Sequence, residues 1–342
     1  MTSALNDLLR ATSRSFYLTL RILPRAVRPQ IGLAYLLART ADTIADTDAV
    51  PLAERLAALR EFRAAVLGES SAATPQASAD FAAQQASAAE RELLEKPPEA
   101  LAALAKLSST DQQLVRDVLA TIISGQELDL QRFAGAQPSG KIVALATDAE
   151  LDDYTYRVAG CVGEFWTKLC RAHLFPHAPL DEAQLLADAV RFGQGLQLVN
   201  VLRDMPADLA NGRCYLPLAR LTGVGLEPGT LLAPANEAKF LPLYRSYLDV
   251  TEQHLQVGWR YTNALPYAQF RVRLACAWPI LIGIKTIQKL RRANVAALTQ
   301  RVKVSRAEVR GIIAKSALAS PFPLAWRSLV APRSAGSTRA RV

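Results

Sequence analysis

Long stretches of this chain repeat apolar residues with the 3.6-residue period of an α-helix, and this pattern most constrains the fold. Alternating apolar and polar runs bounded by turn residues, which would indicate strands, are nearly absent. The pattern therefore predicts an all-α protein, with helices near residues 3–22, 26–47, 51–67, 110–133, 149–173, 181–204, 237–264, 268–292 and 305–317.

The length of 342 residues and the hydrophobic content of 50% allow one large core. We expect a single domain over residues 1–330, followed by a basic, disordered tail over residues 331–342. Residues 68–98, rich in Ala, Ser and Gln, are predicted to form a surface helix with loose ends.

Charge and composition argue against several functional classes. The net charge of +9 comes from dispersed lysines and arginines without a recognition-helix or aromatic-basic pattern, so we expect no nucleic-acid partner. No uncharged apolar run reaches the roughly 18 residues of a membrane-spanning helix, and the N-terminus lacks a signal peptide's apolar core. The cysteines have no paired spacing, which favours a reduced, cytoplasmic setting; they are Cys161, Cys170, Cys214 and Cys276.

Two pairs of aspartates four residues apart lie inside apolar, helix-patterned segments: Asp42 with Asp46, and Asp204 with Asp208. Aspartate is a poor helix former and is costly to bury without a partner. Magnesium is the simplest partner, because Mg²⁺ takes oxygen ligands and keeps positions open for substrate phosphates. The two pairs therefore predict diphosphate chemistry.

Each pair extends into a polar stripe along one helical face, because residues three, four and seven apart share a face. The stripes are Tyr35, Arg39, Asp42 and Asp46 in the first segment, and Gly193, Gln197, Asn200, Asp204 and Asp208 in the second. The other faces are apolar, so each stripe is expected to face an enclosed space.

Other apparent site signals have ordinary explanations. Asp148 and Asp152 share the four-residue spacing but belong to an acidic helix start, which suits the helix dipole and faces water. Pro176 breaks the helix between His173 and His177, so a zinc pair is not expected.

The aspartate segments resemble those of the squalene and phytoene synthase family, whose members join two prenyl diphosphates head to head. Further motifs carry the same resemblance along nearly the whole chain. In order, they are Ser13-Arg14-Ser15-Phe16, Tyr35 through Asp46, Tyr154 through Gly163, Gln197 through Asp208, and Asn211 through Pro217. The resemblance implies a helical isoprenoid-synthase domain with a central cavity.

The resemblance also implies roles at the diphosphate end of that cavity. Magnesium bridging to the diphosphates would be held by Asp42, Asp46, Asn200, Asp204 and Asp208. Phosphate oxygens would be clamped by Arg14, Arg39 and Arg203, with hydrogen bonds from Ser13 and Ser15. The remaining substrate-binding candidates are Phe16, Tyr35 and Gln197.

Tyr154 matches the family tyrosine that assists proton removal or steers the carbocation; its alternative role is a packed core tyrosine. By helical spacing, a single face carries Tyr154, Val158, Cys161 and Phe165. This face is expected to form part of a dry, apolar wall.

Details of the motifs favour the squalene branch, in which NADPH reduces presqualene diphosphate, over the phytoene and dehydrosqualene branch, which needs no reductant. The first motif reads Asp42-Thr-Ile-Ala-Asp46, and Val302 through Arg306 resembles the basic segment near the reductant. Lys303 is the candidate reductant-binding residue, with a solvated helix-start lysine as the alternative. Pro206 should bend or end its helix near Asp208.

We therefore predict a magnesium-dependent enzyme that condenses two farnesyl diphosphates to presqualene diphosphate and reduces it to squalene with NADPH. A phytoene or dehydrosqualene synthase of the same fold is the main alternative. The intact aspartates argue against a non-catalytic scaffold. An oily product would favour peripheral association with a membrane. Substrate chain length and oligomeric state are left open by the sequence.

Overall fold

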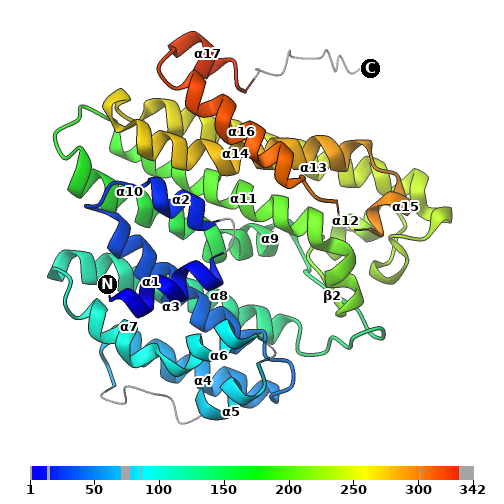
Figure 1. Ribbon diagram of the computed structural model, residues 1–342. Coiled ribbons are helices and arrows are strands. Elements are labelled where there is room, and N and C mark those ends of the chain that lie inside the picture. Colours follow the sequence, from blue (N-terminus) through cyan, green and yellow to red (C-terminus); the bar gives the residue numbers. More distant parts are fainter. Residues whose placement is uncertain (1, 14–15, 71–77, 86, 301, 331–342) are drawn as a thin grey trace.

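The computed structural model describes residues 2–13, 16–70, 78–85, 87–300 and 302–330. The expected tail at 331–342, together with Arg14 and Ser15, lies outside these residues, as does the side chain of Phe16. The all-α prediction is confirmed: the described chain is built from helices, with one two-stranded sheet (Figure 1). Among the helices in these ranges, none is long and apolar enough to cross a membrane.

The helices fall into two groups along the chain. The first group comprises α1 (Ser3–Thr12), α2 (Phe16–Ile22), α3 (Arg28–Ala45), α4 (Leu52–Leu67), α5 (Ser78–Ala83), α6 (Ala88–Glu95), α7 (Pro97–Leu104) and α8 (Ser109–Arg132). The second comprises α9 (Asp148–Thr155), the π-helix η1 (Tyr156–Gly160), α10 (Cys161–Leu174), α11 (Glu182–Ala210), α12 (Leu218–Gly223), α13 (Glu237–Ala264), α14 (Phe270–Arg292), α15 (Val295–Leu298), α16 (Arg306–Ala319) and α17 (Pro323–Arg327). Short 3₁₀ turns are η2 (Pro228–Thr230), η3 (Pro234–Asn236) and η4 (Tyr267–Gln269).

Helix α11 crosses the middle of the molecule, with α13 and α14 on one side and α3 and α8 on the other (Figure 1). One hydrophobic cluster surrounds α11, α13 and α14, and a second joins α3, α4 and α8. Helix α10 contributes to both, since Leu169 belongs to the second cluster and Cys170 to the first. The two clusters therefore share elements.

Three helix predictions need correction. The segment expected at 3–22 is divided into α1 and α2, because α1 ends at Thr12. The segment at 149–173 is interrupted by the π-helix η1. The surface helix expected within 68–98 is replaced, in the described part of that range, by α5, α6 and the start of α7.

Pro206 does not end its helix near Asp208, as one form of the prediction had it, because α11 continues to Ala210. A proline removes the amide that would bond the carbonyl four residues earlier, which here belongs to Leu202. The hydroxyl of Tyr244, on α13, donates to that carbonyl at 2.9 Å. A tertiary hydrogen bond thus replaces the missing one and allows the helix to carry Asp208.

A close helix crossing should make Gly163 one of the least replaceable residues. A Cβ at Gly163, on α10, would lie 2.1 Å from the carbonyl oxygen of Ala189, on α11. We expect Gly163→Ala to lower the free energy of unfolding by at least about 2 kcal/mol, because backbone must move to admit the methyl group. The matched control is Gly311→Ala in α16, where a Cβ meets nothing within 4 Å.

Chemical denaturation of both variants tests this prediction. Gly311→Ala should be neutral or stabilising by up to about 1 kcal/mol, because alanine favours a helix more than glycine does. Equal unfolding midpoints for Gly163→Ala and the unmodified protein would show that the two helices separate easily.

Candidate active site

A cavity of about 480 Å³ lies between α2, α10, α11, α14 and α16. Most of its wall is apolar and includes Leu18, Val158, Trp166, Phe192, Ile282 and Ile313. Helix α11 adds polar groups at Gln197, Asn200 and Arg203. These three residues belong to the turns of α11 that lead to Asp204 and Asp208, so the apolar cavity adjoins the second aspartate pair.

The first aspartate pair lies at the C-terminal end of α3. The guanidinium of Arg39 donates to Asp42 and, at 2.8 Å, to Glu90 Oε1 on α6. Burial raises the pKa of Asp42, opposed by the charge of Arg39. Asp46 forms the helix C-cap, and burial together with the Asp42 charge raises its pKa to about 7. Asp46 is an exposed residue, so its carboxylate keeps part of its hydration.

The second pair lies on the last turns of α11. Arg203 donates through Nε to Asp204 Oδ1 at 3.0 Å, and its Nη2 also contacts Asp204. Burial, and then the neighbouring Asp204 charge, raises the pKa of Asp208 to about 7. Each stripe thus contains an arginine-paired aspartate and a second aspartate whose charge is poorly compensated.

Arg213 connects the two pairs electrostatically. It lies on β2 (Arg213–Cys214), which pairs in parallel with β1 (Val143–Ala144). Its guanidinium lies 3.7 Å from Asp48 and 3.9 Å from Asp129. Its positive charge opposes the rise in the pKa of both Asp46 and Asp208. Asp46 at the end of α3 and Asp208 on α11 therefore both lie within electrostatic reach of Arg213.

A row of polar and aromatic contacts runs from the cavity wall toward α8. Gln197 Nε2 donates to the hydroxyl of Tyr154 at 3.1 Å, and the Tyr154 ring stacks on Tyr215 at 4.6 Å between centroids. The Tyr215 hydroxyl donates to Asp129 Oδ2 at 3.0 Å. Burial raises the pKa of Tyr154 above its ordinary value and that of Asp129 to about 6.

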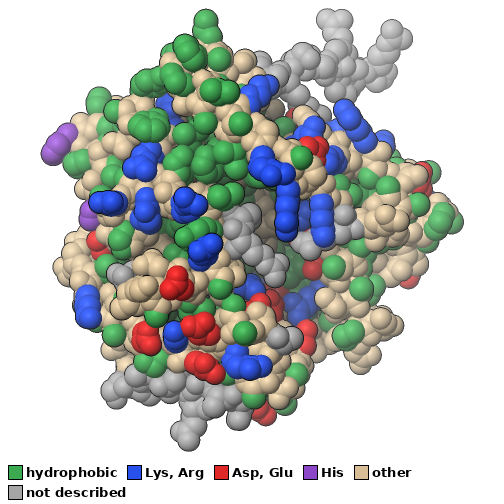
Figure 2. Space-filling view, viewed as in Figure 1, with side chains coloured by type: hydrophobic (Ala, Val, Ile, Leu, Met, Phe, Trp, Pro, Cys, Tyr) green, Lys and Arg blue, Asp and Glu red, His purple; other side chains and the backbone are tan. Residues whose placement is uncertain are grey.

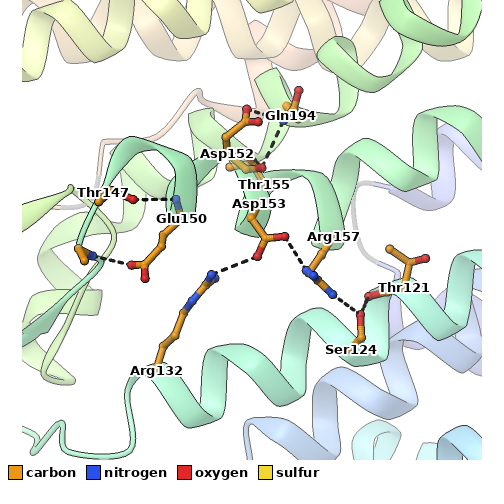
Figure 3. Close-up of polar contacts among 11 residues, drawn as sticks. Thr121, Ser124, Arg132, Thr147, Glu150, Asp152, Asp153, Thr155, Arg157 and Gln194 are labelled. Atoms are coloured by element: carbon orange, nitrogen blue, oxygen red, sulfur yellow. Dashed lines mark hydrogen bonds and ion pairs between the residues drawn. The ribbon is translucent and has the colours of Figure 1, made fainter.

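The segment that carries Tyr154 is held by ion pairs on both sides (Figure 3). Asp153 accepts from Arg132 at 3.1 Å and from Arg157 at 2.7 Å, so it ties α8 to α9 and η1. Gln194, on α11, donates to Asp152 at 2.8 Å. This network fixes the position of Tyr154 relative to α11.

Three further predicted site residues, Ser13, Tyr35 and Lys303, have the following surroundings. The hydroxyl of buried Ser13 donates to the carbonyl of Leu9, so it is used within the end of α1. The Tyr35 hydroxyl donates to the carbonyl of Thr12 at 3.4 Å. Lys303 is exposed in the segment before α16.

The apolar face expected from Tyr154, Val158, Cys161 and Phe165 is divided. Val158 lines the cavity, whereas Cys161 and Phe165 are buried in the hydrophobic cluster around α3 and α8. The reason is the π-helix η1, because its wider turn shifts the helical register between Tyr154 and Cys161. Such π segments are frequent at functional sites.

Residues that the sequence analysis did not single out complete the site: Glu90, Asp129, Arg213 and Tyr215. Arg213 and Tyr215 fall within the segment Asn211 through Pro217, so that motif was the available signal. Glu90 and Asp129 come from helices without an aspartate pair, and only tertiary packing brings them here.

Magnesium suits this donor set. Within the described ranges, no group of three or more His, Cys, Asp or Glu side chains could hold a metal ion alone. Mg²⁺ commonly takes only one or two carboxylates and completes its shell with water and substrate phosphates. Both aspartate pairs also lie near helix C-termini, where the helix dipole disfavours an anion and favours a cation.

Comparison with known proteins identifies similar sequences. A family model described as squalene/phytoene synthase matches residues 9–308. A phytoene synthase from Thermus thermophilus is 35% identical over 192 residues, which cover 53% of this chain and 58% of the relative. A presqualene diphosphate synthase from Rhodopseudomonas palustris is 30% identical over 216 residues, which cover 63% and 62%. The matched segments therefore span less than two thirds of the length of these relatives.

Solved structures share the expected isoprenoid-synthase fold. A structure of TcSQS with a ligand has a TM-score of 0.77 at 21% identity and covers 97% of this chain and 92% of that one. A dehydrosqualene synthase in complex with a ligand has a TM-score of 0.64 at 21% identity and covers 93% and 96%. At such identities the similarity shows the fold alone.

Proposed function

Because this chain belongs to the squalene/phytoene synthase family, we propose that it joins two farnesyl diphosphates head to head into presqualene diphosphate and then reduces this to squalene with NADPH. One observation carries the condensation step. Both aspartate pairs lie within electrostatic reach of Arg213, and Arg203 joins the second pair to an apolar cavity.

The polar end of the cavity is suited to a diphosphate leaving group. Bound magnesium would neutralise phosphate charge and stabilise the departing diphosphate. Arg39 and Arg203 each pair with an aspartate and have the planar geometry that binds phosphate oxygens in a bidentate manner. Asn200, held by Gln197 at 3.2 Å, adds a neutral polar group on the same face.

The apolar wall is suited to the carbocation that remains after ionisation. Side chains such as Val158 and Phe192 carry no nucleophile and exclude water from the cation. Tyr154 is neutral at physiological pH, as an ordinary tyrosine is, and burial raises its pKa further. Its hydroxyl is oriented by Gln197, so Tyr154 would act through an oriented neutral dipole rather than as a phenolate.

The proposal of a reductive step rests on two features. Val302 through Arg306 resembles the family's basic segment near the reductant, and cations surround Lys303. The carbonyl of Lys303 accepts from Lys289 Nζ at 3.1 Å. Lys285 and Lys289 lie 3.9 and 2.7 Å from Glu308. These ammonium groups suit the phosphates of a nicotinamide dinucleotide. Helix α16, which follows, lines the cavity with Ile313.

A phytoene synthase activity is the second candidate, and the similarity to the Thermus thermophilus phytoene synthase favours it. The two candidates differ in substrate chain length and in the need for a reductant. A product assay distinguishes them: purified protein receives magnesium with farnesyl or geranylgeranyl diphosphate, with and without NADPH, and extracts are analysed by mass spectrometry.

Each outcome of the assay has a defined meaning. Squalene formed only with NADPH, and presqualene diphosphate without it, would support the proposal. A C40 product would identify the phytoene branch, and dehydrosqualene formed regardless of NADPH would leave Lys303 without a reductant role. No product from either substrate would refute the proposed condensation.

A further inference from the structure

We infer that η4, α17 and the adjoining ends of α2, α14 and α16 form a docking face for an anionic lipid bilayer. The face consists of exposed apolar and aromatic residues beside a group of arginines. Its apolar part is Tyr267, Phe270, Leu318, Phe322 and Leu324, and its basic part is Arg21, Arg25 and Arg271.

The apolar part is unusually exposed for such large side chains. Leu318, Phe322 and Leu324 are 75%, 63% and 84% exposed, and Tyr267 and Phe270 are 53% and 52% exposed. Single exposed apolar residues are ordinary, but a group of them marks an interaction surface. Hydrophobic side chains gather over α17 and the adjoining part of α16 in the space-filling view (Figure 2).

Specific contacts hold the apolar residues on one rigid base. The Tyr267 hydroxyl donates to the carbonyl of Ser320 at 3.1 Å, which ties η4 to the end of α16. The guanidinium of Arg273 lies 5.6 Å from the centre of the Tyr267 ring and 5.3 Å from that of Trp326, on α17. Side chains from these elements therefore keep their relative positions without a bound partner.

The basic part lies next to the aromatic residues, since Arg271 follows Phe270 directly. Arg21, Arg25 and Arg271 are exposed and lie close enough to repel Arg28. Their charges add to burial in lowering the pKa of Arg28. Exposed arginines grouped around Arg28 indicate a place where an anionic partner would be stabilising.

The combination favours a bilayer over a second copy of this chain. A two-fold dimer through this face would bury the arginines against a second copy of the same surface, and the residues that make up this surface include no carboxylate to pair with them. An anionic bilayer instead offers headgroup phosphates to the arginines and an acyl boundary to the leucines and aromatics.

The position of the face has a consequence that rests on the proposed function. Leu18, on α2, is 43% exposed and also lines the cavity, as do Val309 and Ile313 on α16. The cavity thus lies between the two helices that border the docking face. An apolar product would pass into the acyl layer without crossing water.

Vesicle co-sedimentation of the full chain tests the docking face without any activity measurement. The probes are vesicles of phosphatidylcholine alone and of equal parts phosphatidylcholine and phosphatidylglycerol. We expect binding to the anionic vesicles only, and salt should weaken it. One variant is L318S/F322S/L324S, and the other is R21Q/R25Q. Each variant should bind anionic vesicles at least about tenfold more weakly than the unmodified protein. Each surface arginine contributes about fivefold to the affinity, and each leucine buried in the acyl boundary contributes more.

Control variants change exposed residues elsewhere on the surface. L218S/V250S removes apolar side chains that are each 43% exposed, and R60Q/R245Q removes two exposed arginines. Both controls should bind like the unmodified protein. The face would be refuted by equal binding of all variants, by absent binding of the unmodified protein, or by an apolar variant that only converts a dimer to a monomer. If the triple variant does not fold, R21Q/R25Q decides, since it changes only exposed side chains.

Discussion

Replacing Asp208 by Asn should reduce product formation from farnesyl diphosphate by about a thousandfold or more, while the protein remains folded and becomes more stable. The loss follows because an amide does not hold Mg²⁺ as a carboxylate does, and stabilisation of a leaving group by positioned charge contributes factors of this size. Turnover under saturating magnesium and substrate measures this effect. Asp204→Asn should behave similarly in turnover.

The gain in stability follows from the pKa of Asp208, which burial and Asp204 raise to about 7. The folded protein then holds this proton more tightly than the unfolded chain, whose aspartate titrates near pH 4. Between roughly pH 4 and pH 7 the contribution of Asp208 to the free energy of unfolding should therefore fall as pH rises, and this penalty is fully present above pH 7. Asp208→Asn removes this penalty. The Tm of the variant should therefore exceed the Tm of the unmodified protein at pH 8, and the two Tm values should be nearly equal at pH 4.

Asp7→Asn is the matched control for this variant, because it makes the same substitution at an exposed position on α1. Its turnover and its Tm should equal those of the unmodified protein at both pH values. Full turnover by Asp208→Asn would remove Asp208 from the site. A lower Tm at pH 8 would mean that Asp208 has a stabilising partner when folded.

Magnesium and inorganic diphosphate should bind this protein together and hardly at all separately. The described carboxylates contain no complete metal site, so Mg²⁺ without diphosphate would keep most of its water ligands and bind weakly. Diphosphate alone meets carboxylates that repel it, because Asp46 and Asp208 have little compensating charge. With both present, magnesium offsets the phosphate charge, and phosphate oxygens complete the metal shell. Binding to the folded state then stabilises it by RT ln(1 + [L]/Kd), where [L] is the free ligand concentration.

Thermal unfolding measures this cooperation directly. We expect a shift below about 1 °C with either component and about 4 °C or more with both at saturation. In the turnover assay, removal of divalent cations with EDTA should abolish product formation, and added magnesium should restore it. The double variant Asp42→Asn/Asp204→Asn should lose the joint shift. The same shift with diphosphate alone, or full turnover in EDTA, would contradict the proposed role of magnesium.

The helical class and the two polar stripes could be predicted from the sequence, and the diphosphate chemistry of the stripes stays a prediction. Helical period and residue spacing are local properties, so they can be read without knowing which helices meet. The positions of Asp42, Asp46, Asp204 and Asp208 on the last turns of two helices agree with that reading.

Tertiary structure alone decided three further features. Near Pro206, the carbonyl of Leu202 accepts a hydrogen bond from Tyr244, which lies 42 residues from Leu202 in the sequence. The division of the expected apolar face depends on the π-helix η1, which forms where α9 and α10 pack against α11. The charge around the carboxylates depends on Arg213 and Asp129, brought together by a short parallel sheet and by α8. Each feature arises from contacts between residues distant in the sequence, and no local spacing encodes such contacts.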